Sequence, residues 1–427
     1  MTERPCIEFA PDFALVDLSR QALAILGREW LLHGHLQDRA GMPLVHTDRP
    51  REEMEAVAID EWMGASPIYS ARTQRALNFV GDGVDTIMKN LQFDIGAPHH
   101  FMDFRCTVHD HDHGEFFLAH CGALMDVEPM GEEYVRGMCH TIEDPTFDAT
   151  AVATNPRAQI RPIHRPPRVP ADQHPHCHWT VTIDESNPPV SAHPNLAVVE
   201  ASLAAQCRID DPGAGTEPGG WDDYSQPFDP DFALEDLSQR ALVVMLQEIA
   251  LQSHLLLRSF CVAVSERVGG EVAIGMVAQM AVGLAGVTGE RLRAAFDFGD
   301  GAAGLAALLQ VHPMLWPRTY VHPIIELEGD RVRFALRDDS PIFAEADDFT
   351  WLASMPGAAD RALLSLAQGF DRRAFADPVA PRPGERCAYE LGVDERAEPA
   401  VEQPEVSLTK ISTGATFVMT PRRPVRV

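Results

Sequence analysis

The sequence predicts an α+β fold made of two tandem homologous domains, each with N-terminal helices followed by an antiparallel sheet. Three observations carry this prediction: a repeated segment, the same order of helix-like and strand-like runs in both halves, and an Asp-, Gly- and Pro-rich stretch between them. The N-terminal copy is expected over residues 1–208, a linker over 209–226 and the C-terminal copy over 227–427. We expect the two domains to pack as a pseudo-dimer.

The repeat is visible by direct comparison of the chain with itself. Residues 9–19 read FAPDFALVDLS, and residues 228–238 read FDPDFALEDLS. Similarity of this density indicates an internal duplication. Further identities at the same offset are Ala22/Ala241, Leu23/Leu242, Glu29/Glu248, His35/His254 and Arg39/Arg258.

The elements of each copy follow from hydrophobic periodicity and from turn residues. The N-terminal copy is expected to have helices over 14–35, 70–90 and 132–143 (the last stopped by Pro145), hairpin strands over 101–108 and 115–125, and closing strands over 177–184 and after Pro194. The C-terminal copy is expected to have helices beginning at Ala233 and Gly270, hairpin strands over 320–327 and 331–336, and closing strands over 387–394 and after Pro404. Helices placed before and between strands are typical of an α+β domain.

Composition limits the classes of partner. The chain has 427 residues, a formal net charge of −28 and 45% hydrophobic residues, which predicts a soluble globular protein. So large a negative charge repels phosphate groups, so nucleic acid and anionic membranes are not expected partners. With neither a signal-like N-terminus nor a long uninterrupted apolar run, we expect a cytoplasmic monomer or homodimer. Its eight cysteines are then thiols or metal ligands.

Histidine and cysteine are distributed unequally between the copies. Fifteen of 18 histidines and five of eight cysteines precede residue 200. Residues that both copies share are expected to be architectural, which assigns Cys177 and His35 to the scaffold because Cys387 and His254 match them. Residues peculiar to one copy are candidates for function; Cys121 and His140, for example, align with Leu336 and Met355.

These unmatched residues suggest a metal site in the N-terminal copy. Thiolates and imidazoles are ligands for zinc or iron, and a carboxylate one helical turn away, such as Glu143 or Asp144, can orient a ligand or move a proton. The three histidines between 109 and 113 are read either as further ligands or as solvated residues of a hairpin tip. The predicted ligands are Cys121, Cys139, His140, His176 and His178.

A thiol mechanism is an open alternative. Cys121 or Cys139 would attack the substrate with a histidine as base, and Glu143 or Asp144 would orient the imidazole. Both a nucleophile and a metal ligand require the thiolate, so spacing does not separate the two roles. In either case the guanidinium groups of Arg105 and Arg136 are expected to bind a carboxylate on the substrate.

The order of these residues resembles the L-2-amino-thiazoline-4-carboxylate hydrolase-like family. The resemblance rests on Cys121, the pair Cys139 and His140, Asp144, and the segment PHCHWTV at 175–181. The closing Cys-x-aromatic strand is similar to small-molecule-binding 4-vinyl reductase domains. The similarity covers residues 14–184 and, more weakly, 233–394. It implies hydrolytic ring opening of a small C–N heterocycle, or ligand sensing, with roles for Cys121, His140 and Asp144.

We therefore expect a hydrolase that cleaves C–N bonds in a small polar or heterocyclic molecule. The N-terminal copy would be catalytic, with a divalent metal (zinc or iron) or a thiol, and the C-terminal copy would be a degenerate scaffold. Two alternatives remain: a non-catalytic protein that binds or senses a small molecule or metal, and a non-haem iron oxidoreductase.

Overall fold

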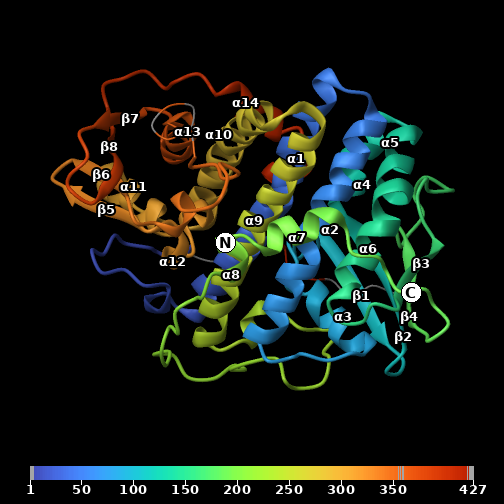
Figure 1. Cartoon of the computed structure of the whole chain (residues 1–427). Helices are drawn as coiled ribbons and strands as arrows, with labels where there is room; N and C mark the ends of the chain where they lie inside the picture. The colour runs from blue at the N-terminus through green and yellow to red at the C-terminus, as the bar shows by residue number, and fades with distance from the viewer. Residues whose placement is uncertain (1–3, 354, 356, 358–359, 421, 423–427) are drawn as a thin grey trace.

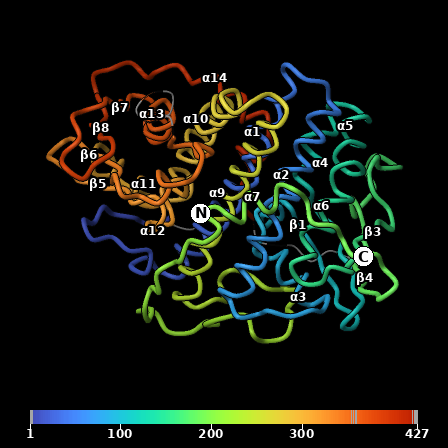
Figure 2. Tube along the Cα trace, in the orientation of Figure 1, coloured from blue at the N-terminus to red at the C-terminus, as the bar shows by residue number. Residues whose placement is uncertain are grey.

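The fold has two four-stranded antiparallel sheets at opposite sides of the molecule, with long helices between them (Figures 1 and 2). The computed structural model describes residues 4–420 and 422, apart from 354, 356, 358 and 359. The α+β prediction is confirmed. The outer ends of the two predicted copies, residues 1–3 and 423–427, lie outside the described residues.

The central layer consists of four long helices: α1 (Arg20–Asp48), α2 (Arg51–Ala76), α9 (Gln239–Val268) and α10 (Gly270–Ala295). α1 packs against α9 and α10, and α2 packs against α9, so helices from the two halves share one core. α9 and α10 are long and apolar enough to cross a membrane, but 89% and 72% of their most apolar windows are buried inside the fold. Such burial is what core helices show.

The first long helix of each half begins in the same way. The Ser19 hydroxyl accepts a hydrogen bond from the amide of Ala22, and the Ser238 hydroxyl accepts one from Ala241, both at 3.2 Å. A serine at this position satisfies an amide that the helix leaves without a partner. The repeated segment is therefore a helix-start signal in both halves.

The two sheets have the same strand order. The first sheet runs β1-β2-β4-β3, and the second runs β5-β6-β8-β7. Both predicted hairpins, β1–β2 and β5–β6, are confirmed. The strands are β1 (Met102–Val108), β2 (His113–Cys121), β3 (Ala158–His164), β4 (His178–Ile183), β5 (Pro323–Glu328), β6 (Arg331–Arg337), β7 (Ala374–Val379) and β8 (Glu385–Val393).

Shorter helices cover the sheets and the ends of the long helices. α3, α4, α5 and α6 belong to the side of the first sheet, and α11, α12 and α13 to the side of the second (Figure 1). The shorter helices are α3 (Val84–Leu91), α4 (Gly122–Val127), α5 (Glu132–Arg136), α6 (Glu143–Val152), α7 (Pro194–Glu200), α8 (Leu203–Gln206), α11 (Gly301–Gln310), α12 (Arg318–Val321), α13 (Asp360–Phe370) and α14 (Pro404–Thr409).

Several predictions about elements are wrong. The strand expected over 115–125 ends at Cys121, because helix α4 begins at Gly122. The expected helix over 70–90 is the end of α2 followed by α3, and α2 begins at Arg51. The helix expected to stop before Pro145 continues, because this proline lies in the first turn of α6, where a missing amide is tolerated. The strands expected after Pro194 and Pro404 are helices α7 and α14, which begin at those prolines.

Candidate functional site

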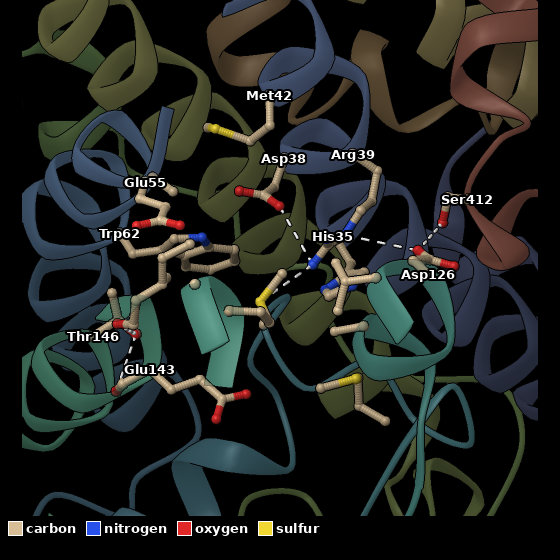
Figure 3. A pocket seen from close by; sticks show the side chains of 18 of the residues that line it. His35, Asp38, Arg39, Met42, Glu55, Trp62, Asp126, Glu143, Thr146 and Ser412 are labelled. Carbon is tan, nitrogen blue, oxygen red and sulfur yellow. Dashed lines mark hydrogen bonds and ion pairs between the residues drawn. The ribbon is translucent and has the colours of Figure 1, made fainter. Parts of the chain in front are cut away.

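A cavity of about 350 Å³ lies in the N-terminal half, between α1, α2 and the segment from α4 to α6 (Figure 3). Its volume and its mixture of apolar walls with a few polar groups are typical of small-molecule sites. Aromatic and methionine side chains make up much of the wall: Trp62, Phe104, Tyr134, Phe147, Met42, Met54, Met102, Met130 and Met138. The ionisable residues in the wall are His35, Asp38, Arg39, His46, Glu55, Asp94, Asp126 and Glu143.

The helices present these side chains because of their spacing. Asp38 and Met42 are one turn apart on α1, and Glu55 and Trp62 are two turns apart on α2, so each pair shares a helix face. Figure 3 shows Glu55 and Trp62 on one side of the cavity and Asp126 on the other.

Arg39 is a basic group on the cavity wall that already has acidic neighbours. Its guanidinium lies 3.5 Å from the Asp38 carboxylate and 3.9 Å from that of Asp126, and 13% of its side chain is exposed. One of its nitrogens also lies 3.9 Å from the Met138 sulfur. Two carboxylates therefore offset the single positive charge.

Burial weakens the acidity of three carboxyl groups at or behind this wall. It raises the pKa of Glu143 to about 8, while Arg165 acts in the opposite direction. It raises the pKa of Asp94 to about 6, and hydrogen bonds from the Gly96 amide and the Tyr69 hydroxyl oppose that rise. Glu61 lies behind the wall, and burial together with Asp38 raises its pKa well above the usual range.

Two of these carboxyl groups have unused hydrogen-bonding capacity. Oδ1 of Asp94 accepts hydrogen bonds from the Tyr69 hydroxyl at 3.1 Å and from the Gly96 amide at 2.7 Å, but Oδ2 bonds to no described residue. Glu61 is 0% exposed, and neither of its carboxyl oxygens bonds to a described residue. Buried polar groups are usually satisfied, so such groups beside a cavity indicate a place for a ligand.

The segment Gly137–Ile142 between α5 and α6 is π-helical. It contributes Gly137, Met138 and Ile142 to the cavity wall. A Cβ atom at position 137 would lie 2.2 Å from Glu55 Oε1, so any larger residue there would have to displace the end of this glutamate side chain. π-Helical turns inside helices are often found at functional sites.

The C-terminal segment of the chain completes the wall. Asp126 accepts hydrogen bonds from the Ser412 hydroxyl at 2.6 Å, the Thr413 amide at 2.7 Å and the Thr413 hydroxyl at 2.6 Å. Ile411 and Ser412 line the cavity. We call residues 411–417 the C-terminal strap. It comes from the far half of the chain and lies across the cavity of the near half.

Removing the Asp126 carboxylate is expected to loosen this strap. In Asp126→Ala, three hydrogen bonds are lost, so amide hydrogen exchange in residues 412–417 should quicken by about 10- to 100-fold. Asp184→Ala is the matched control, because Asp184 accepts hydrogen bonds from the amide and the hydroxyl of Ser186 in an exposed turn, at 2.7 and 2.6 Å. Mass spectrometry should locate its effect at 185–187. Equal exchange at 412–417 in wild type and Asp126→Ala would contradict the assignment.

The corresponding region of the C-terminal half is nearly filled. A cavity of only about 20 Å³ lies beside His254, the match of His35, and Leu257 and Trp351 are in its wall. Arg258, the match of Arg39, pairs with Asp347 at 2.7 Å and with Glu345 at 3.5 Å. The large cavity is thus a feature of one half.

The predicted thiols lie near one another but behind the cavity wall. Cys139 is buried within electrostatic reach of Cys121, Cys177 and Glu143. Burial raises the pKa of Cys121 to about 12, and Glu143 adds to the rise. Burial raises the pKa of Cys139 and Cys177 as well. These thiols are therefore protonated at neutral pH, which disfavours a nucleophilic role.

The predicted histidines and Asp144 point to other partners. His140 Nε2 lies 2.7 Å from the carbonyl oxygen of Pro166, and Asp144 pairs with Arg165 at 2.5 Å. His178 Nε2 lies 2.8 Å from the Glu115 carboxylate. His176 is buried with its ring near those of His120 and His174, at centroid distances of 6.1 and 4.8 Å. Of the predicted catalytic residues, Glu143 lines the cavity.

The predicted substrate-binding arginines and the hairpin histidines lie outside the cavity wall. Arg105 pairs with Asp103 at 2.8 Å, and the exposed Arg136 pairs with Glu132. The histidines at 109, 111 and 113 are exposed at the tip of the β1–β2 hairpin, where carboxylates accompany them. Within the described part of the chain, no three His, Cys, Asp or Glu side chains stand in a metal-binding arrangement. The five predicted ligands do not form one site.

Asp38, Glu55 and Glu61 were missed because the sequence comparison followed histidine and cysteine. The same comparison of the two copies identifies them, since α2 and α10 share their bounds at the offset of the repeat. The signal is a charged residue in one copy that aligns with an apolar residue in the other. The pairs are Asp38/Leu257, Glu55/Ile274 and Glu61/Met280.

Comparison with models of known families, with curated proteins and with solved structures finds no match for the chain. The resemblance to the thiazoline-carboxylate hydrolase-like family stays a prediction, and the cavity in the N-terminal half is the candidate site.

Proposed function

We propose that the N-terminal half binds a small polar or heterocyclic molecule in its cavity and hydrolyses a C–N bond in it. The observation that carries the proposal is a cavity of about 350 Å³ whose wall holds a carboxyl group that is protonated at neutral pH. Carboxyl groups with shifted pKa values in a cavity are candidates for acid–base roles.

The chemistry assigns two carboxyl groups opposite roles. Glu143, with a pKa of about 8, gives a proton to the departing nitrogen. Asp94, with a pKa of about 6, is mostly ionised at neutral pH and takes a proton from the attacking water. The water oxygen bonds to carbon, the C–N bond breaks, and solvent returns the two carboxyl groups to their starting states. Both side chains line the same cavity.

The thiol- and metal-dependent versions of this hydrolase have less support. The thiols are buried with raised pKa values, and the predicted ligands are dispersed. In the proposed reaction Glu143 and Asp94 therefore transfer the protons, and neither Cys121 nor Cys139 acts as nucleophile. Both versions remain predictions that variants of these residues would test.

We also propose that the two halves are a fused pseudo-dimer in which the C-terminal half is a scaffold. Reciprocal contacts support this, as a two-fold interface requires. Glu29 of α1 pairs with Arg291 of α10 at 2.7 Å, and Glu248 of α9 pairs with Arg72 of α2 at 2.9 Å. Glu29 corresponds to Glu248 in the two copies, and Arg72 corresponds to Arg291.

Ring opening of 2-amino-2-thiazoline and of dihydrouracil, followed by proton NMR on the full chain, tests the hydrolytic proposal. We expect turnover of at least one compound, reduced by about 100-fold or more in Glu143→Gln. Glu132→Gln is the matched control, because this exposed glutamate on α5 lies outside the cavity.

Each other outcome counts against the proposal in a different way. Binding without ring opening, detected as a thermal shift that Ala58→Phe in the cavity wall abolishes, would contradict hydrolysis and favour the sensing alternative. If neither compound binds and neither is turned over, the proposed binding and the proposed hydrolysis are both contradicted. Turnover that survives in Glu143→Gln would remove this carboxyl group from the mechanism.

A further inference from the structure

The charge of the cavity wall is unbalanced. Five carboxyl groups line the cavity, and the guanidinium of Arg39 lies among them: Asp38, Glu55, Asp94, Asp126 and Glu143. Asp38 and Asp126 are the partners of Arg39. Of the other three, Glu55 is 3.4 Å from Arg51, and Arg165 acts on Glu143 from a distance. Asp94 has no ion pair among the described residues, and its Oδ2 is unpartnered.

The carboxyl groups lie beside aromatic surface. Around Gly96, the Trp62 ring and Asp94 Oδ1 both approach the position of a Cβ atom, at 3.3 Å and 3.1 Å. Glu55 lies two helical turns before Trp62 on the same face of α2 (Figure 3). An indole ring next to a carboxylate can hold an ammonium or amidinium group, because the ring quadrupole and the negative charge attract the same cation.

The rest of the wall favours a ligand with an apolar part. Phe104, Phe147 and the methionines cover the remaining surface. Methionine side chains adapt to irregular apolar shapes and contact aromatic rings favourably. A small inorganic cation would not cover this apolar surface. An organic molecule would cover it, and removing the surface from water would favour binding.

We propose that the ligand of this cavity is a small organic cation, in which an ammonium or amidinium group lies between Trp62, Asp94 and Glu55 and an apolar or aromatic body fills the methionine-lined part. This inference rests on the proposed function for the location of the site, and it adds the chemical class of the ligand. Binding places a positive charge among carboxyl groups that burial otherwise makes hard to ionise.

The test compares three probes of one shape and different charge: tryptamine, tryptophol and indole-3-propionate. We expect calorimetric titration of the full chain at pH 7.5 to give tryptamine a Kd at least about 10-fold lower than that of tryptophol, with indole-3-propionate weakest. Glu55→Gln and Asp94→Asn should each weaken tryptamine by about 10-fold and change tryptophol little. Glu271→Gln, at an exposed position on α10, is the control for loss of one charge.

The outcomes separate the ligand class from the site itself. Equal affinities for the three probes, or tightest binding of indole-3-propionate, would overturn the proposal that the ligand is a cation. If Ala58→Phe abolishes that binding, the cavity is still the binding site. Failure of all three probes to bind would also overturn the proposal of a cationic ligand. Tryptamine binding that is unchanged in Glu55→Gln and Asp94→Asn would overturn the assigned position.

Discussion

Glu248→Gln is expected to lower the free energy of unfolding by about 3 to 5 kcal/mol, because it leaves the guanidinium of Arg72 buried without its counter-charge. The pair is bidentate, with Arg72 Nε and Nη2 each 2.9 Å from one carboxylate oxygen, and the two side chains are 10% and 6% exposed. Glu29→Gln should cost a similar amount, since Arg291 holds Glu29 through the same two nitrogens at 2.7 and 3.0 Å.

Chemical denaturation of the single variants, with two comparisons, tests this expectation. Glu132→Gln removes an exposed pair in which Arg136 and Glu132 are 55% and 65% exposed, so it should change the free energy of unfolding by less than about 1 kcal/mol. Arg72→Met combined with Glu248→Met should be less damaging than Glu248→Gln alone, because no unpaired charge remains. A loss in Glu248→Gln as small as that in Glu132→Gln would mean that the buried pairs do not hold the halves together.

The repeat in the sequence predicted where the first long helix of each half begins. The helix-start signal at Ser19 and Ser238 recurs because both copies must satisfy the same free amides at the start of a helix. The hairpins were predictable because strand-like runs flank Gly329 at the β5–β6 turn and lie on both sides of the turn that precedes Gly114 in β2. Local rules of this kind depend on residues close in sequence.

The first part of α2 was not predictable from periodicity. Its apolar stripe is interrupted by Glu55 and Glu61, which are buried, and Pro67 lies inside the helix. A helix that contributes charged residues to a cavity does not show the apolar face by which surface helices are recognised. Glu55, one of the residues that interrupt the apolar stripe, also lines the cavity.

The cavity lies in the half in which the site was predicted, but most of the predicted site residues lie outside its wall. Glu143 was identified from its position one turn after Cys139, and it lines the cavity. His140 and Asp144 follow the same spacing rule, but the π-helical turn changes which side chains share a face, and both pair outside the cavity. The strap at residues 411–417 comes from the opposite end of the chain, and no local pattern indicates where it lies.

A second large effect is expected from Glu143→Gln, as a change in how stability depends on pH. Burial raises the pKa of Glu143 from 4.5 to about 8 in the folded protein. Between these values the folded state holds a proton that the unfolded state has released, so the free energy of unfolding falls as pH rises through this window and levels off above about pH 8. Glutamine carries no titrating proton, so the variant lacks this contribution.

The difference between the two proteins isolates Glu143 from its neighbours. Asp94, Glu61, Asp144, Arg165, Arg39 and the thiols of Cys121, Cys139 and Cys177 are present in both, so their titrations cancel to first order. From pH 4.5 to pH 8 we expect the variant to gain about 2 to 4 kcal/mol relative to wild type, less than the full shift allows because water reaches the cavity. Denaturation curves at several pH values measure this, with Glu132→Gln as an exposed control. A constant difference across the window would show that Glu143 titrates as an ordinary surface carboxyl, and the proton assigned to it for C–N cleavage would be absent at neutral pH.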